Sequence, residues 1–261
     1  MRPVFILLLL LVPILGVYTF ATAAEHGWWF PPNVATFGGD IDRLFYLILW
    51  MVGITFVITE LTLVWFVYRY SRQRQEKAAF THGNHKLELL WTAVPAVLLL
   101  FIAFAQMDTW AKIKFERTFP EEGRYSRENP IAEVVASQFD WRVRYPGRDG
   151  TLGTVDDLEN PFEFVVPLGE DVVFNLRSRD VIHSFFVPEF RLKQDALPGH
   201  TIPVWFNAMQ AGTYDLVCAE LCGWGHYKMA GRVRVLPRAD FEAWLAGLEE
   251  DWFSNGTEET E

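Results

Sequence analysis

Two long apolar stretches limit what this chain can fold into more than any other feature of its sequence. The first runs from residue 44 to about residue 68, and the second runs from residue 89 to residue 107. Each has about 20 residues, the length that an α-helix needs to cross the hydrocarbon core of a bilayer. We therefore expect a transmembrane helical hairpin over residues 44–107, surrounded by membrane lipid.

The loop between these stretches indicates how the hairpin is oriented. It holds a single acid, Glu76, before Glu88 at its far edge. Its basic residues are Arg69, Arg72, Arg74, Lys77 and Lys86. Loops rich in Lys and Arg stay on the cytoplasmic side of the membrane. Both flanking regions are therefore predicted to lie outside, as in a multi-pass protein of a bacterial-type inner (plasma) membrane.

Residues 1–23 have the pattern of a secretory signal peptide. An apolar run follows Arg2, and small residues with A-x-A spacing come after it. This order predicts cleavage after Ala23. The alternative is an uncleaved membrane anchor, which Pro13 does not exclude. In either case, residues 24–43 form an exported N-terminal segment.

From about residue 131 the pattern changes to short alternating runs, rich in Val, Phe, Tyr and Trp and separated by Gly, Pro and Asp. This spacing predicts an antiparallel sandwich or barrel over residues 131–240. The predicted strands include residues 133–145, 162–166, 172–176, 203–206, 214–218 and 231–235.

Three other segments complete the predicted organisation. Residues 108–130 are expected to be a linker. The Gly/Asp-rich residues 146–160 are expected to be a solvated loop, because their acids do not have the spacing of an EF-hand. Residues 241–261 are predicted to form a C-terminal helix and an acidic tail, with the short helix at residues 240–251 and the disordered tail at residues 254–261.

The charge is concentrated in the second half of the chain. Residues 108–261 carry 16 basic and 27 acidic side chains, a net charge of −11, whereas the first 107 residues carry 7 and 6. Nucleic-acid binding needs a basic surface, so this half does not suit it. An acidic domain does suit a basic protein partner.

Residues 218–229, C-A-E-L-C-G-W-G-H-Y-K-M, hold two thiols, an imidazole and a thioether within twelve residues. Soft sulfur ligands combined with imidazole favour copper over magnesium or calcium. A mononuclear blue-copper site needs one cysteine, so the second thiol suggests two thiolates that bridge two copper ions. Each ion then needs its own histidine, and His183 in D-V-I-H-S-F-F-V-P is the natural second imidazole.

Three other interpretations of these residues remain open. Cys218 and Cys222 could form a disulfide, since an exported domain meets an oxidising compartment. The site could bind zinc through two cysteines and two histidines, although C-x3-C spacing is unusual and Met229 would be idle. Met229 could also be an ordinary core residue. The combination of these ligands after a membrane-anchored β domain favours copper.

These segments resemble the copper-binding segments of cytochrome c oxidase subunit II, and the similarity extends over about residues 40–240. The resemblance implies a binuclear copper centre, CuA, with two copper ions. Its ligands would be His183, Cys218, Glu220 through its carbonyl group, Cys222, His226 and Met229. The resemblance also implies that the side chain of Glu220 reaches a magnesium ion at the interface with subunit I.

Two further segments resemble this family. Residues 85–95, H-K-L-E-L-L-W-T-A-V-P, are similar to the start of its second membrane helix, where a glutamate at the Glu88 position lies at the mouth of a proton path. Residues 138–141, Q-F-D-W, are similar to its aromatic patch near the copper. Phe139 replaces the tryptophan that normally receives the electron, and Asp140 replaces an aromatic residue. Electron uptake is therefore expected at either Phe139 or Trp141.

Together these features predict two transmembrane α-helices followed by an all-β, cupredoxin-like Greek-key sandwich on the outer, periplasmic face. The predicted function is electron relay in a proton-translocating cytochrome c oxidase. Cytochrome c would reduce the copper pair, which passes the electron to haem in subunit I, where O2 is reduced to water.

Two alternative functions remain. One is another electron-transfer system, such as nitrous oxide reductase, against which the membrane hairpin argues. The other is a copper-delivery or thiol-redox protein that uses Cys218 and Cys222 as a reactive pair. A purple protein with a copper resonance favours electron transfer, and a colourless protein with titratable thiols favours delivery.

Overall fold

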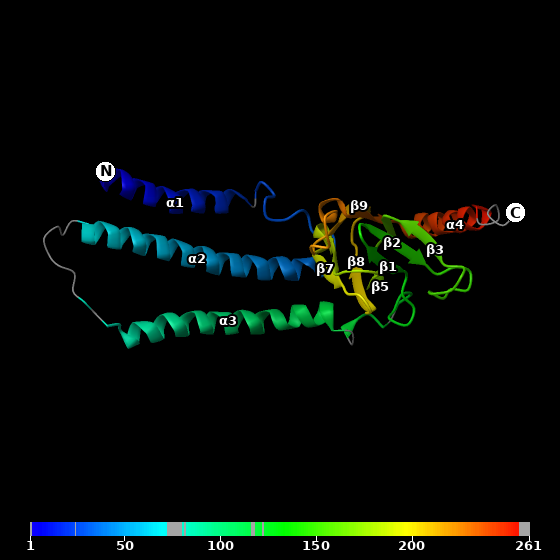
Figure 1. Cartoon of the computed structure of the whole chain (residues 1–261), viewed down its shortest axis with the longest axis horizontal. Helices are drawn as coiled ribbons and strands as arrows, with labels where there is room; N and C mark the ends of the chain where they lie inside the picture. Colours follow the sequence, from blue (N-terminus) through cyan, green and yellow to red (C-terminus); the bar gives the residue numbers. More distant parts are fainter. Residues whose placement is uncertain are drawn as a thin grey trace. The chain divides into compact units, whose positions relative to one another are not determined.

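The computed structural model describes residues 2–23, 25–71, 80, 82–115, 118–121 and 123–255, and the chain forms two compact units (Figure 1). The helical unit comprises Met1–Phe30 and Asp40–Asp108. The β unit comprises Pro31–Gly39 and Thr109–Glu261.

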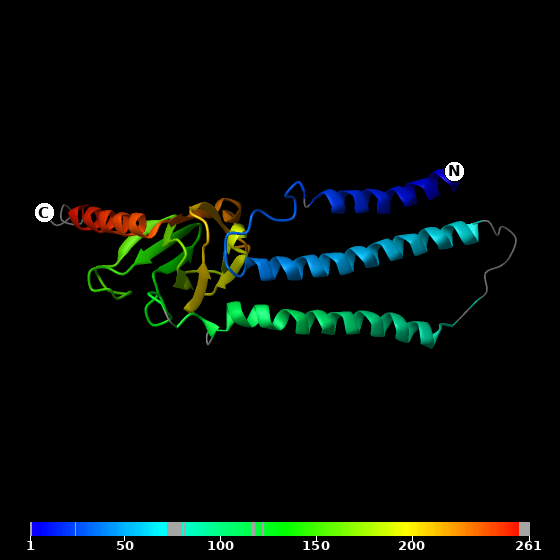
Figure 2. The same ribbon diagram turned by 180° about the vertical axis from the view of Figure 1, so that it is seen from behind.

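The helical unit is built from three apolar helices: α1 (Arg2–Ala23), α2 (Gly38–Ser71) and α3 (His85–Lys114). α2 and α3, drawn as long ribbons in Figure 2, each contain a stretch of mean hydropathy 2.2 that is long enough to span a membrane. None of the residues in these stretches is buried, and large apolar side chains such as Trp50 and Phe104 are exposed. Because a soluble protein does not expose apolar surface on this scale, lipid is the solvent for both helices. The predicted hairpin is confirmed.

α1 covers the predicted signal segment and packs on α2. The ring of Phe20 meets the ring of Trp50 edge-on, with centroids 4.9 Å apart. A signal peptide and a retained anchor are both helical, so this packing does not choose between them. Cleavage after Ala23 stays a prediction, and Ala24 lies outside the described residues.

The start of α3 is fixed by an N-cap. The side-chain oxygen of Asn84 accepts hydrogen bonds from the backbone N–H groups of Lys86 and Leu87, at 3.1 and 3.3 Å. Glu88 lies in this first helical turn, where a negative charge is favoured by the helix dipole. The predicted loop residues Arg72, Arg74, Glu76 and Lys77 lie outside the described residues.

The β unit is a sandwich of two five-stranded sheets within the described residues, ordered β3-β2-β1-β5-β8 and β4-β10-β9-β6-β7. Its architecture is the predicted cupredoxin-like sandwich. The strands are β1 (Glu133–Ser137), β2 (Asp140–Tyr145), β3 (Leu158–Pro161), β4 (Glu163–Pro167), β5 (Asp171–Ser178), β6 (His183–Val187), β7 (Leu192–Ala196), β8 (Ile202–Asn207), β9 (Gly212–Cys218) and β10 (Ala230–Leu236).

The sheets are mixed, which corrects the prediction of a purely antiparallel arrangement. β1 pairs in parallel with β5, and β10 pairs in parallel with β4. The remaining pairs of neighbouring strands are antiparallel. The sequence spacing missed this because alternation marks a strand but carries no information about the direction of its neighbour.

Several boundaries also differ from the predictions. The predicted strand 133–145 is two strands that turn at residues 138–139, and the predicted loop 146–160 ends inside β3. β6 and β7 were not predicted as strands. The C-terminal helix α4 (Arg238–Asn255) begins earlier and ends later than expected. Ser254 and Asn255, the first residues of the predicted disordered tail, belong to this helix, and residues 256–261 lie outside the described residues.

Aromatic side chains from both sheets fill the core of the sandwich. The fully buried ring of Phe174 on β5 lies 5.1 Å from Phe164 on β4 and 5.1 Å from Phe185 on β6. It also lies 6.1 Å from Phe206 on β8. Packed aromatic pairs contribute about 0.5–1.5 kcal/mol each beyond the burial of their area. This core fixes β6, the strand that carries the first metal-ligand candidate.

Candidate metal centre

Two paired strands position the site. His183 is the first residue of β6, and Cys218 is the last residue of β9. The strands are antiparallel, with Phe185 opposite Cys218. Because His183 lies two residues before Phe185, it shares the same face of the sheet. The chain then enters the loop 219–229, whose base is closed by a 3.1 Å hydrogen bond from the N–H of Cys218 to the carbonyl of Met229.

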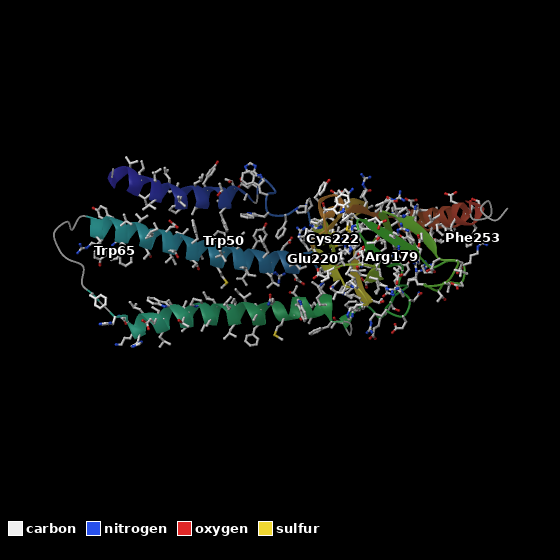
Figure 3. The ribbon with its side chains drawn as sticks, viewed as in Figure 1. Trp50, Trp65, Arg179, Glu220, Cys222 and Phe253 are labelled. Atoms are coloured by element: carbon white, nitrogen blue, oxygen red, sulfur yellow. The ribbon has the colours of Figure 1, made fainter. Side chains whose placement is uncertain are left out.

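The first half of the site surrounds the Cys218 thiol. Its Sγ atom lies 3.9 Å from Nδ1 of His183 and 3.9 Å from Sγ of Cys222. The carbonyl oxygen of Glu220 lies 3.2 Å from the same sulfur. The Glu220 side chain is exposed beside Cys222 on this loop (Figure 3).

The second half surrounds the Cys222 thiol. Its Sγ atom lies 3.7 Å from Nδ1 of His226 and 3.7 Å from Sδ of Met229. His226 begins a single 3-10 turn, η3 (His226–Lys228), that places Met229 back over the sulfur atoms. The structure thus brings all six predicted ligand groups together.

The sulfur ligands are shielded from water. Cys218, Cys222 and Met229 are 8%, 4% and 2% exposed, and His183 is fully buried. Burial, together with the neighbouring Cys218 thiol, raises the pKa of Cys222 to about 11. Metals bind thiolates, so at neutral pH a cation must displace a proton from Cys222.

Asp180 orients His183. Its Oδ1 atom lies 2.8 Å from Nε2 of His183, which leaves Nδ1 to face Cys218. Burial acts to raise the pKa of Asp180, but hydrogen bonds from His183 and from the N–H groups of Gln138 and Val181 outweigh it and lower the pKa. An ionised carboxylate behind a histidine is typical of metal-binding imidazoles. The D-x-x-H spacing of Asp180 and His183 is the sequence signal for this pair, and Asp180 was not among the predicted site residues.

Gln138 connects the two halves of the site. Its backbone N–H donates to Oδ2 of Asp180 at 2.7 Å, and its side-chain Nε2 donates to the carbonyl oxygen of Cys222 at 2.5 Å. Gln138 belongs to the turn between β1 and β2, far from the loop in sequence. Sequence reasoning missed this role because nothing local indicates it.

The donor set fits copper. Both cysteines are free thiols, and their 3.9 Å separation is nearly twice the roughly 2.05 Å of a disulfide bond. A tetrahedral zinc site would use the two thiols and two imidazoles but leave Met229 and the Glu220 carbonyl without a role. Three sulfur atoms with two imidazoles make a soft set that favours copper.

Comparison with known proteins decides the family. The periplasmic-domain model of cytochrome c oxidase subunit II matches residues 132–235, and the transmembrane-domain model of the same subunit matches residues 24–108. An alternative cytochrome c oxidase subunit 2 from Bradyrhizobium diazoefficiens is 32% identical over 240 residues, which cover 84% of this chain and 83% of that protein. The chain belongs to the cytochrome c oxidase subunit II family.

Other subunit II proteins are similar along most of their length. Cytochrome c oxidase subunit 2 of Thermostichus vulcanus is 29% identical, covering 88% of this chain and 81% of its own. Among solved structures, the periplasmic domain of subunit II (CoxB) of Bradyrhizobium japonicum is 26% identical with a TM-score of 0.42, covering 48% of this chain and 96% of that domain.

Membership makes the chain a subunit of a haem-copper oxidase, an oxidoreductase complex with further subunits. Its two membrane-spanning helices carry the β unit on the outer face of the membrane. The family implies copper, and His183, Cys218 and Cys222 form a cluster in the described part of the chain that could hold a metal ion.

The two residues expected to take up electrons lie in different surroundings. Phe139 is half-buried, and its ring lies 5.0 Å from that of Trp224. Trp141 is fully buried on β2, with its ring 6.3 Å from that of His183. Trp141 therefore offers no surface to a donor protein. Glu88, the residue of the expected proton path, belongs to the helical unit.

Proposed function

We propose that this chain is the electron-accepting subunit of its oxidase. It takes electrons one at a time from a cytochrome c at a binuclear copper centre, and it delivers them to haem in subunit I, where O2 is reduced to water. The observation that carries this proposal is the meeting of two imidazoles, a thioether and a backbone carbonyl around two thiols 3.9 Å apart. A second thiol has no role at a mononuclear site.

Cys218 and Cys222 would hold the two copper ions jointly, and His183, His226, Met229 and the Glu220 carbonyl would supply the remaining ligands. When bound, copper supplies reversible one-electron redox chemistry. The chain's own residues hold the ligands in place: Asp180 fixes the ring of His183, and Gln138 fixes the loop at Cys222. Shielding by the fold keeps water from the sulfur atoms.

The acidic β unit would attract a basic donor. The net charge of −11 on residues 108–261 favours encounter with a basic cytochrome c through long-range steering. Among acids near the site, Asp180 and Glu220 are exposed. Asp140 instead accepts a hydrogen bond from Ser137 and lies 3.3 Å from Nε of Arg142, which partly offsets its charge.

Two further roles belong to the same proposal. Glu88 would collect protons on the cytoplasmic side for a path into subunit I, since it is exposed at the start of α3. The side chain of Glu220 would bind magnesium at the interface with subunit I, while its backbone carbonyl faces the copper site. Carboxylate oxygen is a ligand that magnesium prefers.

The alternative of a thiol-redox or copper-delivery protein is disfavoured by the state of the cysteines. Reactive cysteines are accessible thiolates with lowered pKa values. Here both thiols are buried, and burial beside Cys218 raises the pKa of Cys222 to about 11.

The test is the reduction of the intact oxidase by reduced cytochrome c, followed in a stopped-flow instrument. We expect copper to be reduced before haem, with a second-order rate that falls steeply as salt screens the attraction. Haem reduction with no preceding copper phase would contradict the proposal. A rate that ignores salt would argue for a tethered or acidic donor instead of a basic cytochrome c.

A further inference from the structure

We propose that Trp224 is the residue that the electron donor touches, so that electrons reach the copper site through its indole ring. The inference rests on the proposed function and assigns a residue to it. The three sulfur ligands and His183 are buried and His226 is only half-buried, so an electron from another protein reaches the site through the surface of the loop that carries His226.

Trp224 is an exposed aromatic residue inside the metal-binding loop. Its side chain is 77% exposed, although it lies between Cys222 and His226 in the sequence. Only Gly225 separates it from His226, which makes a short covalent route to an imidazole ligand. Exposed tryptophan is otherwise uncommon on a surface facing water, and tryptophan is enriched among the residues that dominate binding at interfaces.

The indole is held in place on two sides. The ring of Phe139 meets it edge-on, with centroids 5.0 Å apart, and Nζ of Lys228 lies 4.8 Å from its centroid. Tyr227 on the same loop is 84% exposed, but no comparable ring or cation contact holds it within the described residues. A ring with a fixed position loses less conformational entropy on docking than a free one.

The glycines on either side of Trp224 allow this arrangement. Gly223 has φ +137°, and a Cβ atom there would lie 2.7 Å from Nε2 of Gln138. A Cβ atom on Gly225 would lie 2.5 Å from Cδ2 of Phe139. Side chains at these positions would push the loop away from the β1–β2 turn. The two glycines of the segment G-W-G therefore let the loop lie against Phe139, while the indole of Trp224 is exposed.

The electron count is simple. The haem iron of a c-type cytochrome is oxidised from ferrous to ferric, and the copper site gains that one electron. Trp224 provides contact and electronic coupling, it is neither oxidised nor reduced overall, and no proton moves. Phe139 acts through Trp224 as a positioning residue.

The test uses Trp224→Leu in the full chain, assembled in its oxidase complex, with Tyr227→Leu as the matched control. Two properties are measured: the second-order rate of copper reduction by reduced c-type cytochrome, and the dissociation constant of the fully oxidised pair, which needs no turnover.

We expect Trp224→Leu to lower the rate and weaken binding by about tenfold or more, the loss typical of an aromatic hot spot. Tyr227→Leu should change either value by less than about twofold. Unchanged copper content and copper resonance in both variants would show that the site itself is intact.

Phe139→Leu separates positioning from direct contact. If Phe139 only places the indole, the Phe139→Leu substitution should slow copper reduction when Trp224 is present. The same substitution should have no further effect in a chain that already carries Trp224→Leu. Equal loss from Phe139→Leu in both backgrounds would overturn this assignment. The assignment would also be overturned if cytochrome c reduces the wild type rapidly and Trp224→Leu has the same reduction rate and dissociation constant as the wild type. In that case the proposed function would still stand. A wild-type complex that takes no electrons from any c-type cytochrome would overturn both.

Discussion

The helical unit and the β unit use apolar side chains in opposite ways. In α2 and α3 the large apolar residues point outward, and Phe104 is 72% exposed. In the sandwich they point inward, and Phe174 is fully buried among other rings. The difference shows that the solvent, lipid or water, decides which face of an element is apolar. Several large apolar side chains of the β unit are nevertheless exposed, and three of them, Leu221, Trp224 and Tyr227, lie on the metal loop.

The largest expected effect is the loss of copper after substitution of the buried cysteines of the metal site. Cys218→Ser or Cys222→Ser should abolish copper binding at the pair, because a hydroxyl group is a hard, poor ligand for copper. Met229→Leu should retain copper, because a weak axial thioether tunes the potential more than it holds the metal. Metal analysis of the purified full-length variants measures this. Full copper content in a serine variant would contradict the assignment.

The second prediction compares the two units directly. Phe174→Ala should lower the free energy of unfolding of the β unit by about 3–5 kcal/mol, since it leaves a cavity among three rings. Phe104→Ala on α3 should change it by less than about 0.5 kcal/mol, the usual effect of a surface substitution. Denaturant titration of the full chain in detergent, followed by circular dichroism, gives both values. A similar loss of unfolding free energy in both variants would contradict the difference between the buried rings of the β unit and the exposed rings of the helical unit.

The third prediction concerns the carboxylate behind His183. Asp180→Asn should weaken copper affinity about 10- to 100-fold, the usual cost of losing such a partner. The amide can still accept a hydrogen bond, so the fold should be kept. Competition with a copper chelator measures the affinity, and Asp171→Asn, on β5 of the other sheet, is a matched control. Equal affinity in Asp180→Asn and the control would contradict the role of Asp180.

The smallest expected effect concerns the helical unit. Glu88→Ala should slow oxidase turnover a few-fold while leaving copper reduction by cytochrome c intact, because the proposed proton uptake at Glu88 and the proposed electron uptake at the copper site involve different units. Glu88→Asp, which keeps the carboxylate, should retain most of the turnover. If turnover is unchanged in Glu88→Ala, the residue is only a helix-start acid favoured by the dipole.

The parts of the molecule that could be predicted from the sequence are those with a local signal. The membrane helices follow from the length of an apolar run, and the ligands of the loop lie within twelve residues of one another. The role of Gln138 could not be predicted in this way, because its hydrogen bonds join segments that only the folded sandwich brings together, whereas Asp180 has a local signal three residues before His183. The burial of Trp141 and the parallel pairing of β1 with β5 also depend on how distant strands stack.

We propose that one chain holds two copper ions between Cys218 and Cys222. Electron paramagnetic resonance of the copper-loaded full chain is the direct test. The protein is loaded in the presence of both copper and zinc, and its metal content is measured on the same sample. We expect two coppers per chain and a resonance split by two equivalent copper nuclei. One zinc and no copper, or a resonance split by a single copper nucleus, would contradict it.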